Sequence, residues 1–294
     1  MEREVKVLVL GASGMLGNAV LRLFAQSPGH IVVGSARSAG VLRHLPRALH
    51  EHVICGVDVE NPDSLVQLFT VTKPDVVINC IGLVKQLAQA EDPLAALPIN
   101  ALLPHRLVRL CELVGARFIH VSTDCVFAGT RGMYREEDAA DATDLYGRSK
   151  LLGEVDQPHA VTLRTSIIGH ELQGAHGLVN WFLSQNGLVK GYRRAIFSGL
   201  PTVELARVMR DIVIPRPELH GLYHVSAAPI SKFDLLKLVA REYAKSIQID
   251  PDDALMIDRS LDSTRFRTLS GYTPASWPEL VHRMRQFDPA TNSP

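Results

Sequence analysis

Apolar positions in the first half of the chain form short runs that alternate with amphipathic segments. Residues 5–10 read Val-Lys-Val-Leu-Val-Leu, a pattern typical of a strand buried on both faces of a parallel sheet. Beyond a glycine-rich turn, apolar residues recur on one helical face, at Leu16, Ala19, Val20, Leu23 and Phe24. The pattern therefore predicts a strand, a tight turn and a helix.

The same alternation continues along the chain. Further apolar runs predict strands over residues 30–36, 52–57, 76–80, 118–121 and 161–165. Helical patterns lie between them, one after a capping Asn61 and one over residues 103–114. Strands and helices that alternate at this spacing predict an α/β fold with a doubly wound parallel sheet, here over residues 1–170.

The second half has a less regular pattern. It predicts a short helix over residues 178–183, a basic turn over 190–194 and a strand over 195–197. A further helix is expected from Pro201-Thr202 and a strand over 222–225, so segments near 201–226 are expected to return to the first domain. Residues 171–290 should otherwise form mainly a smaller, substrate-binding domain.

The turn Gly11-Ala12-Ser13-Gly14-Met15-Leu16-Gly17 places three glycines between the first strand and the first helix. Glycine lets the backbone approach a phosphate closely, and the free N–H groups of a helix start favour an anion. An ordinary turn between strand and helix is the alternative. In this context the spacing favours the pyrophosphate site of a dinucleotide.

The end of the second strand bears on cofactor choice. An acidic residue there would bind the ribose hydroxyls of NAD, and this chain has Ser35 and Arg37 instead. An arginine suits a 2′-phosphate, which favours NADP and hence NADPH as the reductant, with NAD as the alternative. A solvated surface arginine would explain the same residue without a ligand.

Candidate catalytic chemistry follows the fifth predicted strand. Tyr146 and Lys150 are four residues apart, so on a helix both project from one face. A nearby ammonium is expected to lower the pKa of the phenol, and such a tyrosine can donate a proton to a carbonyl oxygen. Thr123, at the end of the strand, can add a hydrogen bond to that oxygen.

Composition narrows the remaining classes. The 294 residues carry 31 basic and 31 acidic side chains, which argues against a large nucleic-acid or anionic membrane surface. No apolar run is long enough to span a bilayer, and four scattered cysteines with no H-x-x-x-H pair among 12 histidines favour reduced thiols and no metal. We expect a cytoplasmic protein.

These motifs together resemble the extended short-chain dehydrogenase/reductases, and most closely their dTDP-4-dehydrorhamnose reductase group. The resemblance covers most of the chain and is strongest through about residue 170. It is carried by the glycine turn, Asp58-Val59, Asn100-Ala101 with Pro104, Ser122-Thr123-Asp124-Cys125-Val126-Phe127, Tyr146-Gly147-Arg148-Ser149-Lys150 and Arg164-Thr165-Ser166.

The resemblance implies hydride transfer from NAD(P)H to a keto nucleotide sugar, and it leaves room for a homodimer. It assigns the pyrophosphate to Gly11, Ser13, Gly14, Met15 and Leu16. It places the adenine at Asp58 and Val59, and the ribose at Cys80, Ile81 and Gly82. Lys150 would bind the nicotinamide ribose, while Thr123 and Tyr146 would face the keto oxygen.

Departures from the group concern the substrate half. Ile167 stands where the rhamnose enzymes usually have a tryptophan, and residues 197–200 replace their Asp-Gln pair. Lys85 and Arg193 are candidate substrate-binding residues, the latter for a diphosphate, although a charged turn is more often solvated. Two other functions stay open: an epimerase or dehydratase that retains NAD, and a non-catalytic NADP-binding regulatory subunit.

Overall fold

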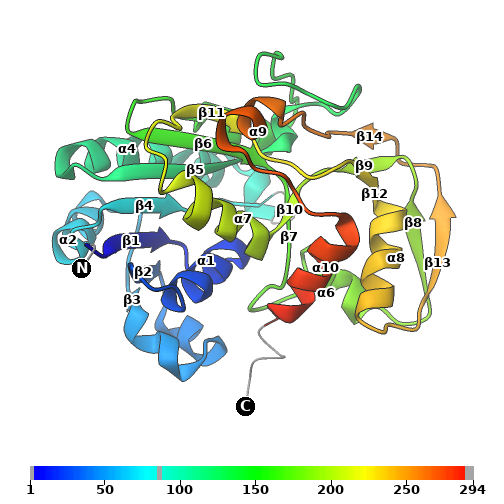
Figure 1. Ribbon diagram of the computed structural model, residues 1–294, viewed down its shortest axis with the longest axis horizontal. Helices are drawn as coiled ribbons and strands as arrows, with labels where there is room; N and C mark the ends of the chain where they lie inside the picture. The colour runs from blue at the N-terminus through cyan, green and yellow to red at the C-terminus, as the bar shows by residue number, and fades with distance from the viewer. Residues whose placement is uncertain (1–2, 85–87, 289–294) are drawn as a thin grey trace.

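A seven-stranded parallel sheet forms the centre of the molecule, whose computed structural model describes residues 3–84 and 88–288 (Figure 1). In spatial order its strands are β11 (Gly221–His224), β6 (Ala160–Thr165), β5 (Arg117–Thr123), β4 (Val76–Asn79), β1 (Val5–Leu10), β2 (His30–Ala36) and β3 (Val53–Cys55). Every neighbouring pair runs parallel. The predicted doubly wound α/β sheet is confirmed.

The strand order reverses beside β1. From β1 the chain continues to β2 and β3 on one side, and then crosses to β4, β5, β6 and β11 on the other. Ligands of such sheets bind outside the carboxyl ends of the strands at this reversal. The ends of β1 and β4, at Leu10 and Asn79, therefore mark the expected site.

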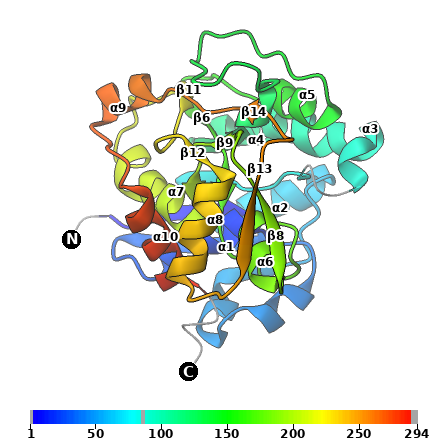
Figure 2. The same cartoon turned by 90° about the vertical axis from the view of Figure 1, so that its right-hand side faces the viewer.

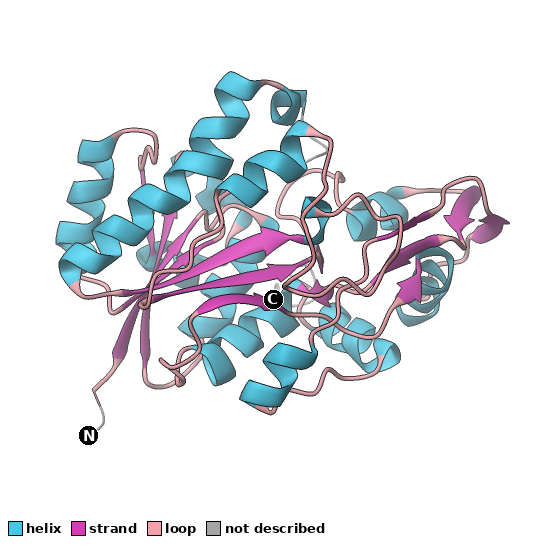
Figure 3. Cartoon of the chain, turned by 90° about the horizontal axis from the view of Figure 1, so that it is seen from above, coloured by secondary structure: helices cyan, strands magenta, loops and turns pink. Residues whose placement is uncertain are grey.

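Helices cover both faces of the sheet (Figure 3). Alternate strand residues point to opposite faces. Val7 and Val9 pack in one apolar cluster with α1 (Met15–Ala25) and α7 (Thr202–Val208). Leu8 and Leu10 pack in another with α2 (Pro62–Thr72) and α4 (Leu103–Val114). The apolar run of β1 is thus explained by burial on both sides.

The remaining elements lie mostly beyond the carboxyl ends of the sheet (Figure 2). Three small sheets are built from β7 (Ile167–Ile168) with β10 (Leu200–Pro201), β8 (Leu188–Tyr192) with β13 (Gln248–Asp252), and β9 (Ala195–Phe197) with β12 (Ile230–Ser231) and β14 (Ile257–Asp258). The other α-helices are α3 (Pro93–Ala96), α5 (Leu145–Leu152), α6 (Leu178–Ser184), α8 (Lys232–Glu242), α9 (Thr264–Ser270) and α10 (Trp277–Gln286).

Helical turns of other kinds connect several of these elements. Four are 3₁₀ turns, at Ala39–His44, Arg47–His52, Ala88–Glu91 and Asp124–Val126. Two are π-helical, at Leu97–Leu102 before α4 and at Met209–Val213 after α7. One sequence expectation is wrong here: Lys190, Gly191 and Tyr192 belong to β8, so the basic turn contains only Arg193 and Arg194. No helix in the described ranges could cross a membrane.

Candidate active site

The glycine turn after β1 is tightly packed. Gly11 has a φ of +82°, and a Cβ there would lie 2.8 Å from Cγ1 of Ile81. A Cβ on Gly17 would lie 2.1 Å from the carbonyl oxygen of Gly11. Side chains are excluded at both positions, so the turn can bring its backbone close to a ligand.

The start of α1 is open to an anion. Its N-cap is Gly14, which supplies no side-chain hydrogen bond, and its first turn contains no acidic residue. In contrast, Asn61 caps α2 and accepts a 2.9 Å hydrogen bond from the N–H of Asp63. Ser13 and Gly14 are exposed, whereas Leu16 is buried. The free N–H groups of α1 therefore fit a pyrophosphate.

The predicted adenine side lies along the ends of β2 and β3. Arg37 directly follows β2 and is exposed, and within the described ranges its guanidinium has no hydrogen-bond or ion-pair partner. Asp58, also exposed, accepts a 3.0 Å hydrogen bond from the N–H of Glu60. Val59 is half-buried beside it. An unpaired arginine at this edge can accept a phosphate without breaking another contact.

The turn after β4 lies next to α5, the helix that carries Tyr146 and Lys150. Asn100, in the π-helical turn before α4, accepts from the N–H of Leu83 at 2.9 Å and donates to Oγ of Ser149 on α5 at 3.2 Å. A Cβ on Gly82 would lie 3.8 Å from Nζ of Lys150. The predicted ribose-binding turn and the lysine are therefore adjacent. Sequence reasoning used Asn100 only for the resemblance and missed its bridging position.

Tyr146 and Thr123 are together at the end of β5. The nearby hydroxyl of Thr123 lowers the pKa of Tyr146, but burial and the charges of Cys125, Asp124 and Asp144 raise it. Burial is the largest of these effects, so the pKa lies above that of free tyrosine. The phenol is thus protonated at neutral pH, as a proton donor must be.

The pKa of Tyr146 is raised, and Lys150 is not among the groups that shift it most, so the expected lowering by Lys150 is wrong. The ammonium turns toward β5, where it donates a 2.8 Å hydrogen bond to the carbonyl oxygen of Val121. Its side chain is buried, which lowers the pKa of Lys150 to about 8, while the charges of Glu154 and Cys80 raise it. Desolvation, rather than pairing with the phenol, dominates the titration of the lysine.

A buried carboxyl group, that of Asp124, lies beside Thr123 and close to Tyr146. Asp124 accepts a 3.2 Å hydrogen bond from the hydroxyl of Thr123, and burial raises the pKa of this carboxyl. The positive charges of Arg259 and Lys232, from the smaller part of the chain, lower that pKa. Sequence reasoning missed both cations because they follow Asp124 by more than 100 residues.

Besides Thr123, two residues are predicted to bind the substrate, Lys85 and Arg193. Arg193 lies in the turn between β8 and β9, where its Nε donates a 2.9 Å hydrogen bond to Asp253 and its Nη2 forms an ion pair with the same carboxylate. Its substrate role stays a prediction, and an anion there would compete with Asp253. Lys85 lies outside the described residues.

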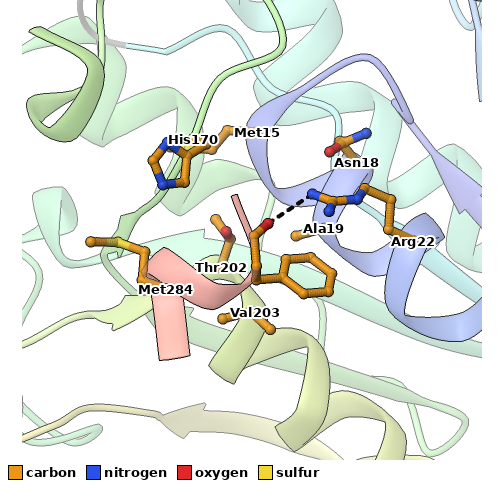
Figure 4. Close-up of a pocket in the computed structure, with 9 residues that line it drawn as sticks. Met15, Asn18, Ala19, Arg22, His170, Thr202, Val203 and Met284 are labelled. Atoms are coloured by element: carbon orange, nitrogen blue, oxygen red, sulfur yellow. Dashed lines mark hydrogen bonds between the residues drawn. The ribbon is translucent and has the colours of Figure 1, made fainter. Parts of the chain in front are cut away.

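Figure 4 shows a small cavity farther along α1, between that helix, α7 and α10. Arg22 fills one side and donates a 2.8 Å hydrogen bond to the carbonyl oxygen of Phe287, and Asn18 and His170 also line the space. Its volume of about 10 Å³ suits roughly one water molecule. This cavity is therefore too small for a nucleotide or a sugar.

Several known proteins are similar in sequence to this chain. A "Probable low-salt glycan biosynthesis reductase Agl14" of Haloferax volcanii is 36% identical over 165 residues, 54% of this chain and 52% of that protein. The rat "Methionine adenosyltransferase 2 subunit beta" is 33% identical over 149 residues, 51% of this chain and 41% of that protein. The chain spans about half the length of these relatives.

Broader matches involve reductases named for a keto sugar. The "dTDP-4-dehydrorhamnose reductase" of Mycolicibacterium smegmatis is 28% identical over 256 residues, which cover 84% of this chain and 71% of that protein. The solved dTDP-4-dehydrorhamnose reductase from Bacillus anthracis, in complex with NADP, superposes with a TM-score of 0.78 at 21% identity. That superposition covers 97% of this chain and 99% of the other.

One family description spans almost the whole chain. The family described as the RmlD substrate binding domain matches residues 5–284. That range contains the glycine turn, Tyr146 and Lys150, and the smaller sheets. The fold and the sequence lead to the same assignment: the chain belongs to the RmlD substrate binding domain family and has an extended short-chain dehydrogenase/reductase fold.

Proposed function

We propose that the protein is an NADPH-dependent reductase that acts on a keto group of a nucleotide sugar. One observation carries the proposal: an uncapped glycine turn and a protonated Tyr146, close to Thr123, lie at the same edge of one sheet. A regulatory protein would need the dinucleotide turn but has no use for a proton donor beside it. The names of the reductase relatives support the same activity.

The residues present fit a nicotinamide dinucleotide. The free N–H groups at the start of α1 suit its pyrophosphate, and the unpaired Arg37 suits a 2′-phosphate, which favours NADPH over NADH. Cys80, Ile81 and Gly82 would border the ribose next to Lys150. When bound, the reduced nicotinamide supplies the hydride.

The chain's own residues would manage the proton. Hydride addition places negative charge on the carbonyl oxygen, and the phenol of Tyr146 donates its proton there. Thr123 orients that oxygen through its hydroxyl. Lys150, next to Gly82, would bind the ribose hydroxyls. Because burial keeps the pKa of Tyr146 high, the phenol retains its proton until the developing oxyanion, a stronger base than the phenolate, accepts it.

The substrate is expected to bind between the catalytic pair and the smaller part of the chain. Lys232 and Arg259 bring positive charge to this side of Asp124, as the phosphates of a nucleotide sugar require. Arg193, already paired with Asp253, is the competing assignment. Because Ile167 replaces a tryptophan and residues 197–200 replace an Asp-Gln pair, a sugar other than 4-dehydrorhamnose is the expected substrate.

A substrate panel tests this proposal. NADPH oxidation should be measured with keto sugars linked to dTDP, UDP and GDP, together with mass spectrometry of nucleotides that co-purify with the protein. The proposal predicts exchangeable NADPH and turnover of at least one keto sugar, with the rhamnose precursor a poor substrate. Tightly retained NAD would favour an epimerase or dehydratase. Absence of turnover with the whole panel would favour a regulatory subunit.

Variants at the two candidate phosphate sites separate the assignments. Lys232→Gln should raise the KM for the nucleotide sugar if the phosphates face Asp124, whereas Arg193→Gln should raise it if they bind the β8–β9 turn. Lys237→Gln is the matched control, because Lys237 is exposed on the same helix as Lys232. A KM equal to that of the wild type in all three variants would exclude both assignments.

A further inference from the structure

Glu154 is a nearly buried carboxylate just beyond the catalytic helix. It follows the end of α5 by two residues, and its side chain is 12% exposed. One oxygen accepts from Oγ of Ser122 at 2.6 Å and from Nε of Arg164 at 2.8 Å. The other accepts from Nη2 of Arg164 at 2.6 Å. The carboxylate thus joins α5 to the ends of both β5 and β6.

Tyr146, Lys150 and Glu154 are spaced four residues apart, so they follow one face of the helix and its extension. Each one contacts the end of β5. The phenol of Tyr146 is close enough to Thr123 for its pKa to respond to that hydroxyl, Lys150 donates to the carbonyl of Val121, and Glu154 accepts from Ser122. Val121, Ser122 and Thr123, which are consecutive in β5, therefore contact side chains that are one helical turn apart on α5 and its extension. Glu154 closes this set at the end opposite the tyrosine.

Glu154 also acts electrostatically on the catalytic lysine. Within the described ranges, no carboxylate lies within 4 Å of the Lys150 ammonium, and Glu154 is the largest of the charges that favour its protonated form. Cys80, beyond β4, acts in the same direction. His120 on β5 is buried and neutral, because burial and the Lys150 charge lower its pKa.

The other contacts of Arg164 fix the orientation of the carboxylate. Arg164 is 3% exposed, and its Nη1 donates a 3.1 Å hydrogen bond to Nε2 of His224. Nδ1 of His224 then donates to the carbonyl oxygen of Tyr134 at 2.9 Å. Burial and the arginine charge lower the pKa of His224 to about 4, so the ring is neutral and can accept from Arg164. The orientation of the Glu154 carboxylate is therefore fixed by Arg164, which is itself held by His224.

We propose that Glu154 is a positioning residue for the reaction: by binding Ser122 and Arg164, it holds α5 against β5 and keeps Lys150 charged and in place beside the ribose site. This inference rests on the proposed function for its catalytic meaning. The competing explanation is a buried ion pair that stabilises the fold and has no influence on Lys150. The two explanations differ in the titration of the lysine.

The test follows Lys150 directly by NMR in protein labelled at the lysine side chains. Loss of one signal in Lys150→Met assigns it. In the wild type this lysine should titrate near the value of about 8. In Glu154→Gln the midpoint should fall by about one pH unit, because a neighbouring opposite charge is removed. In Glu154→Asp, which keeps the charge, the midpoint should stay close to that of the wild type.

Matched variants separate this effect from a loss of packing. Glu204→Gln is the control, because Glu204 is also buried and paired with an arginine, Arg283, but does not act on Lys150. If Glu154→Gln does not fold, the double variant Glu154→Gln with Arg164→Gln removes both charges and leaves no buried ion unpaired. In the double variant the midpoint is compared with that of Arg164→Gln, so that only the charge of Glu154 differs. An unchanged Lys150 midpoint in Glu154→Gln relative to the wild type, or in the double variant relative to Arg164→Gln, would overturn the proposal.

The result can be distinguished from failure of the proposed function. The titration uses no substrate, so it tests the link between Glu154 and Lys150 alone. A shifted midpoint, with a Tyr146→Phe protein that reacts at the wild-type rate, would retain this link and reject the reductase mechanism. An unchanged midpoint, with turnover abolished in Tyr146→Phe, would reject the link and retain the mechanism.

Discussion

Replacing Arg37 by alanine should convert a preference for NADPH into near equality between the two reduced cofactors. The guanidinium is exposed and has no partner within the described ranges, so its removal breaks no contact of the folded chain. A hydrogen bond to a charged group contributes about 1.5–3 kcal/mol. Because Arg37 is exposed to water, its contribution should be at the lower end of this range, ~1.5 kcal/mol. Loss of that contribution corresponds to roughly a tenfold loss of NADPH affinity.

The assay is titration of both reduced cofactors against the wild type and Arg37→Ala, read by fluorescence or calorimetry. NADH affinity should stay the same, because NADH has no 2′-phosphate for the arginine to contact. Raising the salt concentration should weaken NADPH binding to the wild type more than to the variant. Arg43→Ala, a basic residue in the following turn, serves as a control. An equal loss of affinity for both cofactors would refute the assignment of Arg37 to the phosphate.

Three other predictions follow from the same geometry. Gly17→Ala should weaken binding of both cofactors, because its Cβ would lie 2.1 Å from the Gly11 carbonyl oxygen; unchanged affinity in titration would contradict this close packing. Asn61→Ala should lower the free energy of unfolding by about 1 kcal/mol through loss of the α2 cap, measured by urea denaturation, and an unchanged midpoint would count against it. Lys150 should be charged below a pKa of about 8, so kcat/KM for NADPH should fall as the pH rises through that value; a flat profile to pH 10 would show that the ammonium is dispensable.

The sequence predicts the central sheet well, because its strands are buried on both faces. The bounds of β1, β2 and α4 match the apolar pattern residue for residue. β3 is shorter than residues 52–57, because it is an edge strand that pairs only with β2, over Val53–Cys55. The two-residue strands β7 and β10 are too short to show any periodicity.

The candidate site is predictable only as far as local motifs reach. The glycine turn and the pair Tyr146 and Lys150 are each local, so their spacing is visible in the chain. Arg193 and Asp253 are 60 positions apart in the sequence, and no sequence pattern predicts their pairing. The effect of the Lys232 charge on Asp124 depends in the same way on how the smaller part packs against the sheet.

The electrostatic expectation for the tyrosine failed for a related reason. Four-residue spacing places Lys150 on the same helical face as Tyr146, but it does not fix where the ammonium points. In the folded chain Lys150 donates a hydrogen bond to the carbonyl oxygen of Val121. The phenol of Tyr146 instead responds to Asp124, Cys125 and Asp144, whose charges raise its pKa. A buried phenol surrounded by such groups holds its proton more tightly than spacing alone suggests.

The central claim is that Tyr146 protonates the reduced carbonyl oxygen, and single-turnover oxidation of bound NADPH in Tyr146→Phe tests it most directly. The substitution removes the hydroxyl and hardly changes the volume, so folding and NADPH affinity should match the wild type. With a keto sugar that the wild type reduces, the rate should fall by about 10²–10⁴-fold, the usual contribution of a positioned acid. A variant that binds NADPH normally and reacts at the wild-type rate would contradict the account.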